Sequence, residues 1–200
     1  MILGTHLLDN TWAYRLWQAP FAERKLAPIL AHNDLRAVRR VLDVGCGPGT
    51  NTRHFEHAEY LGIDYNSRYI EWARRRHGRA FVVADVTSYN VPADQRFDFI
   101  LANSLLHHVD TPAALRLLAH LADLLTVDGH IHVLDLVLPD APSPARVLAR
   151  WDRGGFPRPL AEWERIFTIH FDPVILESYA IATLGVPLWK MVYFKGRARK

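Results

Sequence analysis

The sequence predicts an α/β protein with a single doubly wound, mostly parallel sheet of seven strands that closes with an antiparallel C-terminal hairpin. From Arg40 onward, short apolar runs alternate with stretches of helical spacing, which is typical of βαβ units. The last two strand-like runs have no helical pattern between them, and Gly185 with Pro187 marks a turn. A chain of 200 residues has room for one domain with a sizeable core.

The expected strands are short, apolar and partly β-branched. The first five are Val41–Val44, Tyr60–Ile63, Ala80–Ala84, Phe97–Ala102 and His130–Leu136. The runs "PVILESYAIATLG" and "VPLWKMVYFKG" form the hairpin. Because parallel strands need long crossover connections, we expect helices on both faces of the sheet.

The expected helices are marked by residues that favour helix ends. "SRYIEWARRRHG" begins with Ser67 as N-cap and stops at Gly78. "TPAALRLLAHLADLLTVDG" begins with Thr111 as N-cap and has Pro112 at its first helical position. Two shorter helices are expected in "SPARVLARW", which starts at Ser143, and in "PLAEWERIF".

Composition limits the classes of protein that the chain can belong to. A hydrophobic fraction of 50% and a charged fraction of 22% are typical of a folded soluble protein. The net charge is only +3, so we expect no nucleic-acid partner. The single Cys46 cannot form an intramolecular disulfide, which favours a reducing compartment. With no signal-peptide pattern and no apolar run of about 20 residues, we expect a cytoplasmic protein without a membrane span.

A glycine cluster follows the first strand, in "RVLDVGCGPGTNT". Gly45 and Gly47 allow a tight turn and a close approach of the backbone to a ligand, and the helix expected after the loop offers free N–H groups. A dinucleotide-binding loop needs glycine where Thr50 stands, and a Walker-type phosphate loop needs a lysine that is missing here. The loop is therefore G-x-G-x-G.

Three successive strands finish near an acid: Asp43, Asp64 and Asp85. Asp64 lies at the place where a carboxylate can accept hydrogen bonds from both ribose hydroxyls of a nucleoside. The carboxyl ends of parallel strands meet at one edge of the sheet. The three acids would form a costly cluster of like charges there unless a ligand supplies donors or a cation.

Four blocks of sequence together resemble the class I S-adenosylmethionine-dependent methyltransferases. They are "VLDVGCGPG", "GIDYN", "VVADV" and "FDFILANSLLHHV", and the resemblance covers residues 38–138 well and the strand ending at Phe194 loosely. It implies a Rossmann-like methyltransferase fold, S-adenosylmethionine as cofactor and S-adenosylhomocysteine as product. The last block is similar to the branch that methylates small molecules such as metabolites and quinone intermediates. It implies in-line methyl transfer to a small-molecule acceptor whose accepting atom (O, N or C) stays open.

The resemblance also implies roles for the matching positions. Asp43 lies near the cofactor's ammonium group. Asp64 bonds the ribose hydroxyls, and Tyr65 lies beside the adenine. Asp85 accepts from the adenine amino group, and the Val86 amide faces the adenine ring. Asn103 and Ser104 border the sulfonium and the transferred methyl group. The implied cofactor-binding positions are Asp43, Gly45, Cys46, Gly47, Gly49, Asp64, Tyr65, Asp85, Val86, Asn103 and Ser104. The structural alternative for Gly49 is close packing of a helix on a strand. For Cys46 it is a small side chain that fills the loop.

His107 and His108 are candidate general bases, because an unperturbed histidine titrates near physiological pH. A structural, hydrogen-bonded histidine is the alternative for either. The two histidines with Asp110 also suggest a metal site, but matching ligands elsewhere in the sequence are lacking, so we expect none.

These predictions divide the chain into four segments. They are an N-terminal helical lid or packing segment (1–39), the cofactor-binding core (40–138), a helical acceptor-side insertion (139–170) and the C-terminal hairpin that completes the sheet (171–200). Tyr14 and Trp17 in the first segment are candidates for acceptor binding or for plain core packing. Arg150 and Arg153 in the insertion, with Asp152 and Arg158, can bind a polar acceptor or form a solvated helix face.

Two other classes of function stay open. A nicotinamide-dependent oxidoreductase uses a similar nucleotide-binding sheet, although Thr50 and the terminal hairpin count against it. A non-catalytic partner subunit would bind the cofactor without transferring a methyl group. The sequence leaves the acceptor and the oligomeric state undetermined.

Overall fold

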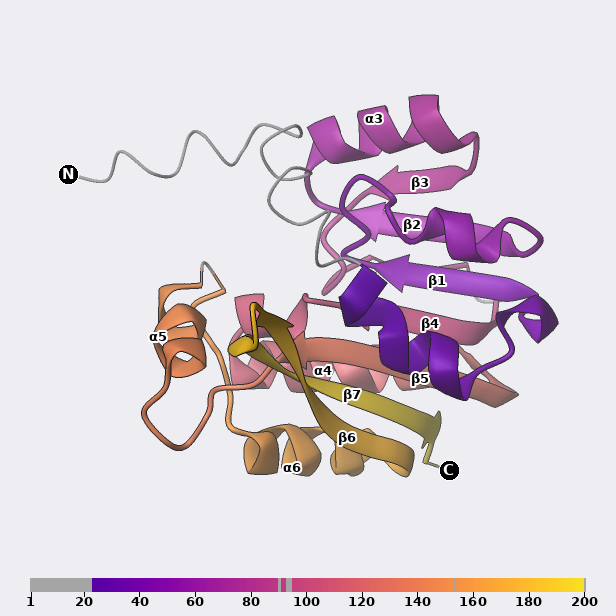
Figure 1. Ribbon diagram of the computed structural model, residues 1–200. Helices are drawn as coiled ribbons and strands as arrows, with labels where there is room; N and C mark the ends of the chain where they lie inside the picture. Colours follow the sequence, from indigo (N-terminus) through magenta and orange to yellow (C-terminus); the bar gives the residue numbers. More distant parts are fainter. Residues whose placement is uncertain (1–22, 90, 93–94, 153, 200) are drawn as a thin grey trace.

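The computed structural model describes residues 23–89, 91–92, 95–152 and 154–199. Within them lies one seven-stranded sheet in the order β3-β2-β1-β4-β5-β7-β6, in which β7 runs opposite to the other six strands (Figure 1). The strands are β1 (Arg40–Val44), β2 (Glu59–Asp64), β3 (Ala80–Val83), β4 (Phe97–Asn103), β5 (Leu125–Leu136), β6 (Phe171–Thr183) and β7 (Val186–Ala198). The predicted fold class is confirmed.

The helices cover both faces of this sheet, as predicted. They are residues 23–32, η1 (Leu35–Ala37), η2 (Thr52–Phe55), α3 (Ser67–His77), η3 (Leu106–His108), α4 (Thr111–Asp123), α5 (Pro144–Trp151) and α6 (Leu160–His170). Among the described residues, no helix is long and apolar enough to cross a membrane.

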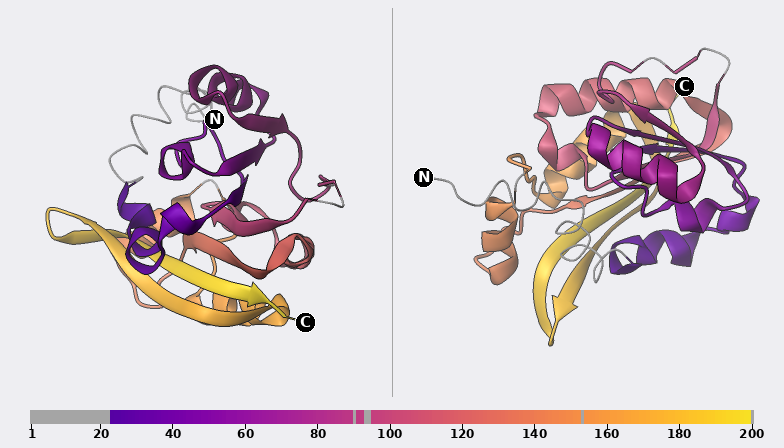
Figure 2. Two further views of the ribbon diagram at one scale, coloured as in Figure 1. Left: turned by 90° about the vertical axis from the view of Figure 1, so that its right-hand side faces the viewer. Right: turned by 90° about the horizontal axis from the view of Figure 1, so that it is seen from above.

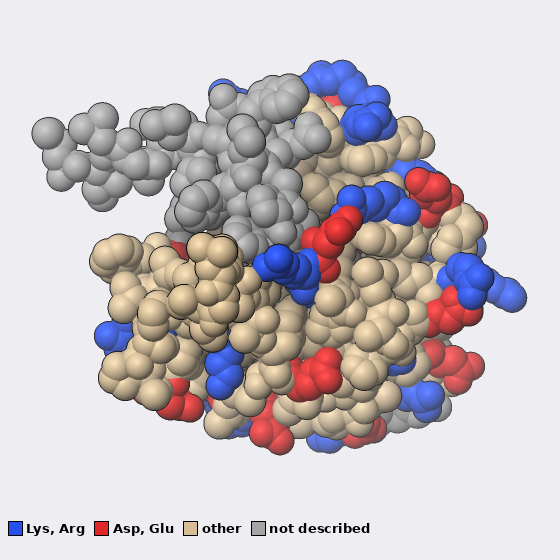
Figure 3. All heavy atoms as spheres, viewed as in Figure 1, with Lys and Arg blue, Asp and Glu red and all other residues tan. Residues whose placement is uncertain are grey.

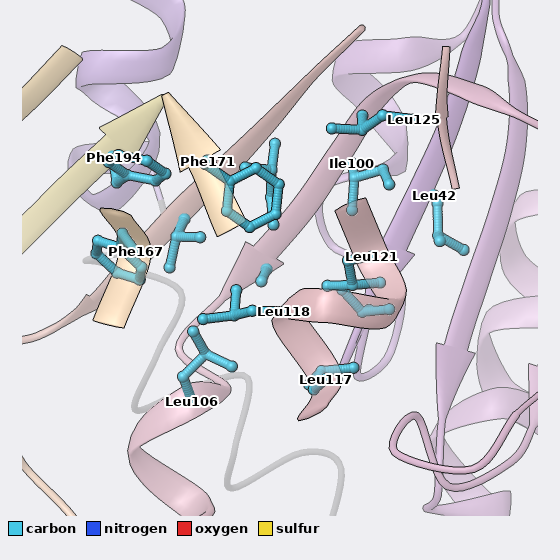
Figure 4. Close-up of a cluster of buried hydrophobic side chains, with 14 of the residues drawn as sticks. Leu42, Ile100, Leu106, Leu117, Leu118, Leu121, Leu125, Phe167, Phe171 and Phe194 are labelled. Carbon is cyan, nitrogen blue, oxygen red and sulfur yellow. The ribbon is translucent and has the colours of Figure 1, made fainter. Parts of the chain in front are cut away.

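Two apolar clusters hold the layers together. On one face, Leu117, Leu118 and Leu121 of α4 and Phe167 of α6 pack against sheet residues such as Ile100 (Figure 4). On the other face, the helix at residues 23–32, η2 and α3 pack against the opposite side of the same strands; the buried side chains there include Leu26, Ile29, Phe55, Ile70, Val41, Phe99 and Leu101. This two-sided burial explains why the parallel strands are nearly continuous apolar runs.

The helix ends differ from the prediction at two of the four marked positions. The N-caps of α3 and α4 are Asn66 and Asp110, one residue before the predicted Ser67 and Thr111. Each cap side chain accepts hydrogen bonds from backbone N–H groups of the first turn, which a carboxylate or amide oxygen does well. Gly78 in the left-handed conformation and Ser143 as a cap are confirmed.

Two further elements differ from the prediction. The glycine loop leads into the short 3₁₀ turn η2, because the segment before β2 is brief and is anchored by the buried Phe55. β5 begins at Leu125 rather than His130, since Leu125 pairs with Phe97 before the register shifts between Phe97 and Phe99.

The winding of the chain reverses between β1 and β4. From β1 the chain moves outward to β2 and β3 and then returns to β4 on the other side of β1. A crevice for ligands forms at such a point, beyond the carboxyl ends of the strands. In Figure 1 the arrowheads of β1, β2 and β3 point toward the side of the molecule where α5 lies. The glycine loop and the insertion thus lie at the same edge of the sheet.

On the face shown in Figure 3, basic and acidic side chains are interspersed over the surface, with no single large patch of either charge. This distribution agrees with the small net charge of +3 of the whole chain.

The β6–β7 hairpin turns at Leu184 and Gly185, and its tip extends beyond the rest of the sheet in both views of Figure 2. Both turn residues have positive φ, 50° and 79°, as a two-residue hairpin loop of type I′ requires. Leu184 is 99% exposed, so no packing offsets the strain of this conformation.

Leu184→Asn is expected to raise the free energy of unfolding by roughly 1 kcal/mol, because asparagine tolerates the left-handed region better than leucine. Urea denaturation measures this change. Leu184→Ala keeps the Cβ strain and is the control; an asparagine variant no more stable than the alanine variant would contradict the account of the turn.

Candidate functional site

The glycine loop is held by the end of the neighbouring strand. The backbone N–H groups of Gly45 and Cys46 both donate to the carbonyl oxygen of Ile63, at 2.8 and 3.0 Å. The Cys46 side chain is buried, and burial raises the pKa of its thiol far above the usual range. Cys46 therefore stays a neutral thiol in this arrangement and fills the space under the loop.

The three glycines of the loop meet different surroundings. A Cβ on Gly45 would lie 2.9 Å from the Leu105 side chain, and one on Gly49 would lie 2.9 Å from Phe81. At Gly47, where φ is +52°, a Cβ would meet no atom within 4 Å. Gly49 thus has the packing role considered above, whereas Gly47 faces open space.

Asp43 is a fully buried carboxylate just before the loop. Its Oδ2 accepts from the Tyr60 hydroxyl at 2.5 Å and from the Asn51 amide at 3.0 Å, while its Oδ1 has no hydrogen-bond partner among the described residues. Burial raises the pKa of Asp43 to about 6, against the hydrogen bonds that lower it. Since the folded state holds this proton more tightly than the unfolded chain, the contribution of Asp43 to stability is lost as the pH rises from about 4 to about 6.

Asp64, at the end of β2, is tied directly to the loop. Its Oδ2 accepts from the Gly47 N–H and its Oδ1 from the Asn66 N–H, both at 2.8 Å. Burial raises the pKa of Asp64 despite these two bonds. Each oxygen keeps a further lone pair, so the carboxylate can still accept from two hydroxyls. Tyr65 beside it is 81% exposed.

Asp85 lies two residues beyond the end of β3 and is exposed. Its Oδ1 accepts from the Thr87 N–H at 2.9 Å and from the Thr87 hydroxyl at 2.8 Å, and these bonds lower the pKa of Asp85. Val86 is half-buried beside it. Their contact with an adenine stays a prediction.

A short polar chain ends β4. The Ser104 hydroxyl donates to the Asn103 Oδ1 at 3.2 Å, and the Lys25 ammonium donates to the Ser104 hydroxyl at 3.1 Å. Ser104 has φ of 56°, a strained value of the kind that gathers at functional sites. Because Leu105 contacts Gly45, this chain borders the glycine loop.

Lys25 was not singled out by the sequence analysis. The Tyr179 hydroxyl donates to its backbone carbonyl at 2.7 Å, which ties the helix at residues 23–32 to β6. Burial lowers the pKa of Lys25, opposed by the charges of Asp152 and Asp135. A lone lysine in an amphipathic helix carries no sequence signal for such a position.

His107 lies between two carboxylates. Its Nδ1 is 2.6 Å from the Asp135 Oδ1, and its Nε2 is 3.1 Å from the Asp152 Oδ1. Burial disfavours the charged imidazole, but these two carboxylates raise the pKa of His107 to about 9. Neither ring nitrogen is left to take a proton from a substrate, so this geometry gives no support to His107 as a base. His108 is exposed, its ring centroid 4.2 Å from that of His107, and its role as a base stays a prediction.

Asp135 is the buried acid that the sequence analysis missed. It stands in β5 within the apolar run "VLDLVL", where a single charge among buried positions was the available signal. Its Oδ2 accepts from the Leu106 N–H and its Oδ1 from the Leu136 N–H. These bonds and His107 hold the pKa of Asp135 below its usual value against the effect of burial.

The insertion is docked on η3 through several contacts. A Cβ on Gly154 would lie 2.0 Å from the His107 ring, and the Phe156 N–H donates to the His107 carbonyl. The Arg158 guanidinium donates to the carbonyls of Leu106 and Val109 and is only 3% exposed. The prediction of a solvated face is therefore wrong for Arg158, and an acceptor contact gains no support, because its donors are used inside the protein.

The other acceptor-side candidates are not brought together by the described structure. Arg150 is exposed on α5. Tyr14, Trp17 and Arg153 lie outside the described residues. Asp110 caps α4 through the Ala113 N–H, and within the part of the chain that the structure describes it belongs to no cluster of potential metal ligands.

Comparisons with known proteins bear on the class of protein to which the chain belongs. The sequence profile of a methyltransferase domain matches residues 41–129. Over 196 residues, the chain is 30% identical to trans-aconitate 2-methyltransferase of Escherichia fergusonii, covering 92% of this chain and 73% of that protein. With the enzyme of the same name from Methylobacterium radiotolerans it is 36% identical over 122 residues, 58% of this chain and 44% of the relative.

The chain belongs to the class I S-adenosylmethionine-dependent methyltransferases. Both relatives named above are trans-aconitate 2-methyltransferases. The chain spans half or less of the length of the Methylobacterium radiotolerans enzyme and of three further curated relatives of the same name. The crystal structure of the N-methyltransferase NodS from Bradyrhizobium japonicum with S-adenosylhomocysteine has the same fold, with a TM-score of 0.75 at 19% identity over 98% of this chain and 96% of that one.

The residues present fit S-adenosylmethionine, the cofactor of this family. The Oδ1 of Asp43, which has no hydrogen-bond partner among the described residues, is a buried acceptor that suits a cationic donor. The open space at Gly47 leaves room next to Asp64, which accepts from the Gly47 N–H. The Asp64 carboxylate suits a pair of hydroxyls at the next strand end.

Gly47→Val is expected to weaken S-adenosylhomocysteine binding at least a hundredfold, because the side chain would fill the open space at the loop next to Asp64. Isothermal titration calorimetry measures the Kd. Gly155→Val is the matched control, since Gly155 also has positive φ, +74°, and open space, but lies in the exposed insertion. Unchanged affinity in the Gly47 variant would overturn the placement of the cofactor at this loop.

Proposed function

We propose that this chain transfers a methyl group from S-adenosylmethionine to a small-molecule acceptor in the cytoplasm. The observation that carries the proposal is the pair of buried acids, Asp43 and Asp64, at the edge where the sheet winding reverses. When bound, the cofactor supplies an electrophilic methyl group on a positively charged sulfur. The chain's own residues then have to bind the cofactor and the acceptor, orient them for transfer and exclude water.

Each strand end has a part in binding. Asp43 holds the cofactor's ammonium group, and Asp64 accepts from the ribose hydroxyls. Tyr65 lies beside the adenine, with Asp85 accepting from its amino group and the Val86 amide facing the ring. The supporting observations are the burial of the first two acids and the alignment of all these residues along one sheet edge.

The acceptor side is formed by the end of β4 and the insertion. Asn103 and Ser104 border the transferred methyl group, and the Lys25 ammonium on Ser104 places a cation beside it. A cation there favours an acceptor that carries a carboxylate, in line with the substrate in the names of the relatives. A carboxylate oxygen is already a nucleophile at neutral pH, so it needs no general base. This agrees with the occupied ring nitrogens of His107.

A thermal-melt comparison with S-adenosylmethionine, S-adenosylhomocysteine and NADH tests the cofactor. At a hundredfold excess over the Kd, binding adds about 2.7 kcal/mol to the free energy of unfolding. This corresponds to a rise in Tm of roughly 5–10 °C. We expect the rise with the two sulfur compounds only, and its loss in Asp64→Ala. A rise with NADH alone would favour an oxidoreductase and sink the proposal.

Methyl transfer itself is tested with labelled S-adenosylmethionine and trans-aconitate, followed by mass spectrometry of the product. Transfer to a carboxylate oxygen is expected. Transfer only to an amine or a hydroxyl would contradict the carboxylate acceptor but keep the methyltransferase. Cofactor binding without transfer to any acceptor would identify a non-catalytic subunit.

A further inference from the structure

Three potential metal ligands come together beside the acceptor side of the site. His107 and His108 belong to η3, and Asp152 follows the end of α5. One ligand atom from each lies within 4.8 Å of the others. We propose that these three residues bind a divalent transition-metal ion. Neighbouring positions in the sequence supply only the two histidines, and folding brings the third ligand from the insertion.

The closest pair of ligand atoms already has a suitable separation. The His107 Nε2 and the Asp152 Oδ1 are 3.1 Å apart, and the ion would take the place of the imidazole proton that joins them. Ligand atoms that each lie about 2.0–2.2 Å from one ion are roughly 3–3.4 Å from one another in octahedral or tetrahedral geometry. His108 is exposed, so rotation of its side chain can close the remaining distance.

The surroundings hold two of the ligands in place. Asp135 accepts from the His107 Nδ1, and it is itself fixed by the Leu106 and Leu136 N–H groups. This carboxylate directs the other ring nitrogen, Nε2, toward Asp152, as outer carboxylates do for histidines that ligate metals. The Gly154 N–H donates to the Asp152 Oδ1 at 2.9 Å and orients that side chain.

The donor set selects the class of ion. Two imidazoles and one carboxylate suit zinc, iron, cobalt, nickel or manganese, whereas magnesium and calcium prefer oxygen ligands alone. Three protein ligands leave coordination positions open, which is the pattern of a metal that meets a substrate. Two nearby carboxylates, Asp135 and Asp152, also offset the positive charge of the ion.

The role of the ion rests on the proposed function. η3 begins two residues after Ser104, so the ion would lie close to the acceptor and bind one of its oxygens. A carboxylate acceptor, or one with a neighbouring hydroxyl, has the oxygen atoms that such an ion takes. The ion and Lys25 would then hold the acceptor from two sides.

Metal binding is tested on the full chain without cofactor or acceptor. After treatment with EDTA and its removal, the protein is titrated with ZnCl₂ and with MnCl₂ in a calorimeter. We expect one equivalent of at least one ion, with affinity at least tenfold weaker in His108→Ala and in Asp152→Asn. His57→Ala removes an exposed imidazole away from the cluster and should leave the affinity unchanged.

Circular dichroism and the thermal shift with S-adenosylhomocysteine are recorded on the same samples. They show whether each variant folds and whether the cofactor site is intact, so a failure of the proposed function is seen separately. No binding of either ion by the wild-type chain would overturn the metal site. Unchanged affinity for the ion in both cluster variants would also overturn the metal site, because it would show that other histidines capture the ion adventitiously.

Discussion

The burial of ionisable carboxylates at the carboxyl edge of the parallel sheet is the constraint on which the site depends. Asp43 has no exposed surface, and one of its oxygens has no partner among the described residues. A sheet that only had to be stable would place an apolar residue there, because an uncompensated buried charge costs several kcal/mol. The loop tolerates this arrangement because the Tyr60 hydroxyl and the Asn51 amide hold the other oxygen.

A second set of charges joins the acceptor side to the sheet. Asp135 in β5 holds His107, His107 holds Asp152, and Arg158 closes the insertion onto the carbonyls of η3. Each charge in this set has an opposite charge or a carbonyl beside it, as buried charges require. The acceptor side is therefore built on the same strands as the cofactor side, and the two are held in one fixed relation.

Much of the fold could be predicted from the sequence because its signals are local. The alternation of strands and helices, the left-handed Gly78 and the hairpin at Gly185 follow from spacing and glycine chemistry, and the structure confirms them. The cofactor class followed from four blocks that each lie within a few residues. The η2 turn and the start of β5 differ because they depend on how the segment packs and on the register with β4.

The acceptor side could not be predicted in the same way. Lys25 reaches Ser104 from a helix near the start of the described chain, and Asp152 reaches His107 from the insertion. Such contacts join residues far apart in the sequence, and no local pattern marks them. Arginine is a residue type that is usually exposed, and only the folded structure shows that carbonyl oxygens surround Arg158.

The most direct test of the central claim is the pH dependence of S-adenosylhomocysteine affinity, from pH 8 to pH 5, for the wild type and Asp43→Asn. If the ionised Asp43 holds a cationic group, wild-type affinity falls about tenfold per pH unit below its pKa of about 6. The asparagine variant binds weakly with little pH dependence, because it has no carboxylate to ionise. Equal affinities and equal pH profiles for the two proteins would contradict the claim.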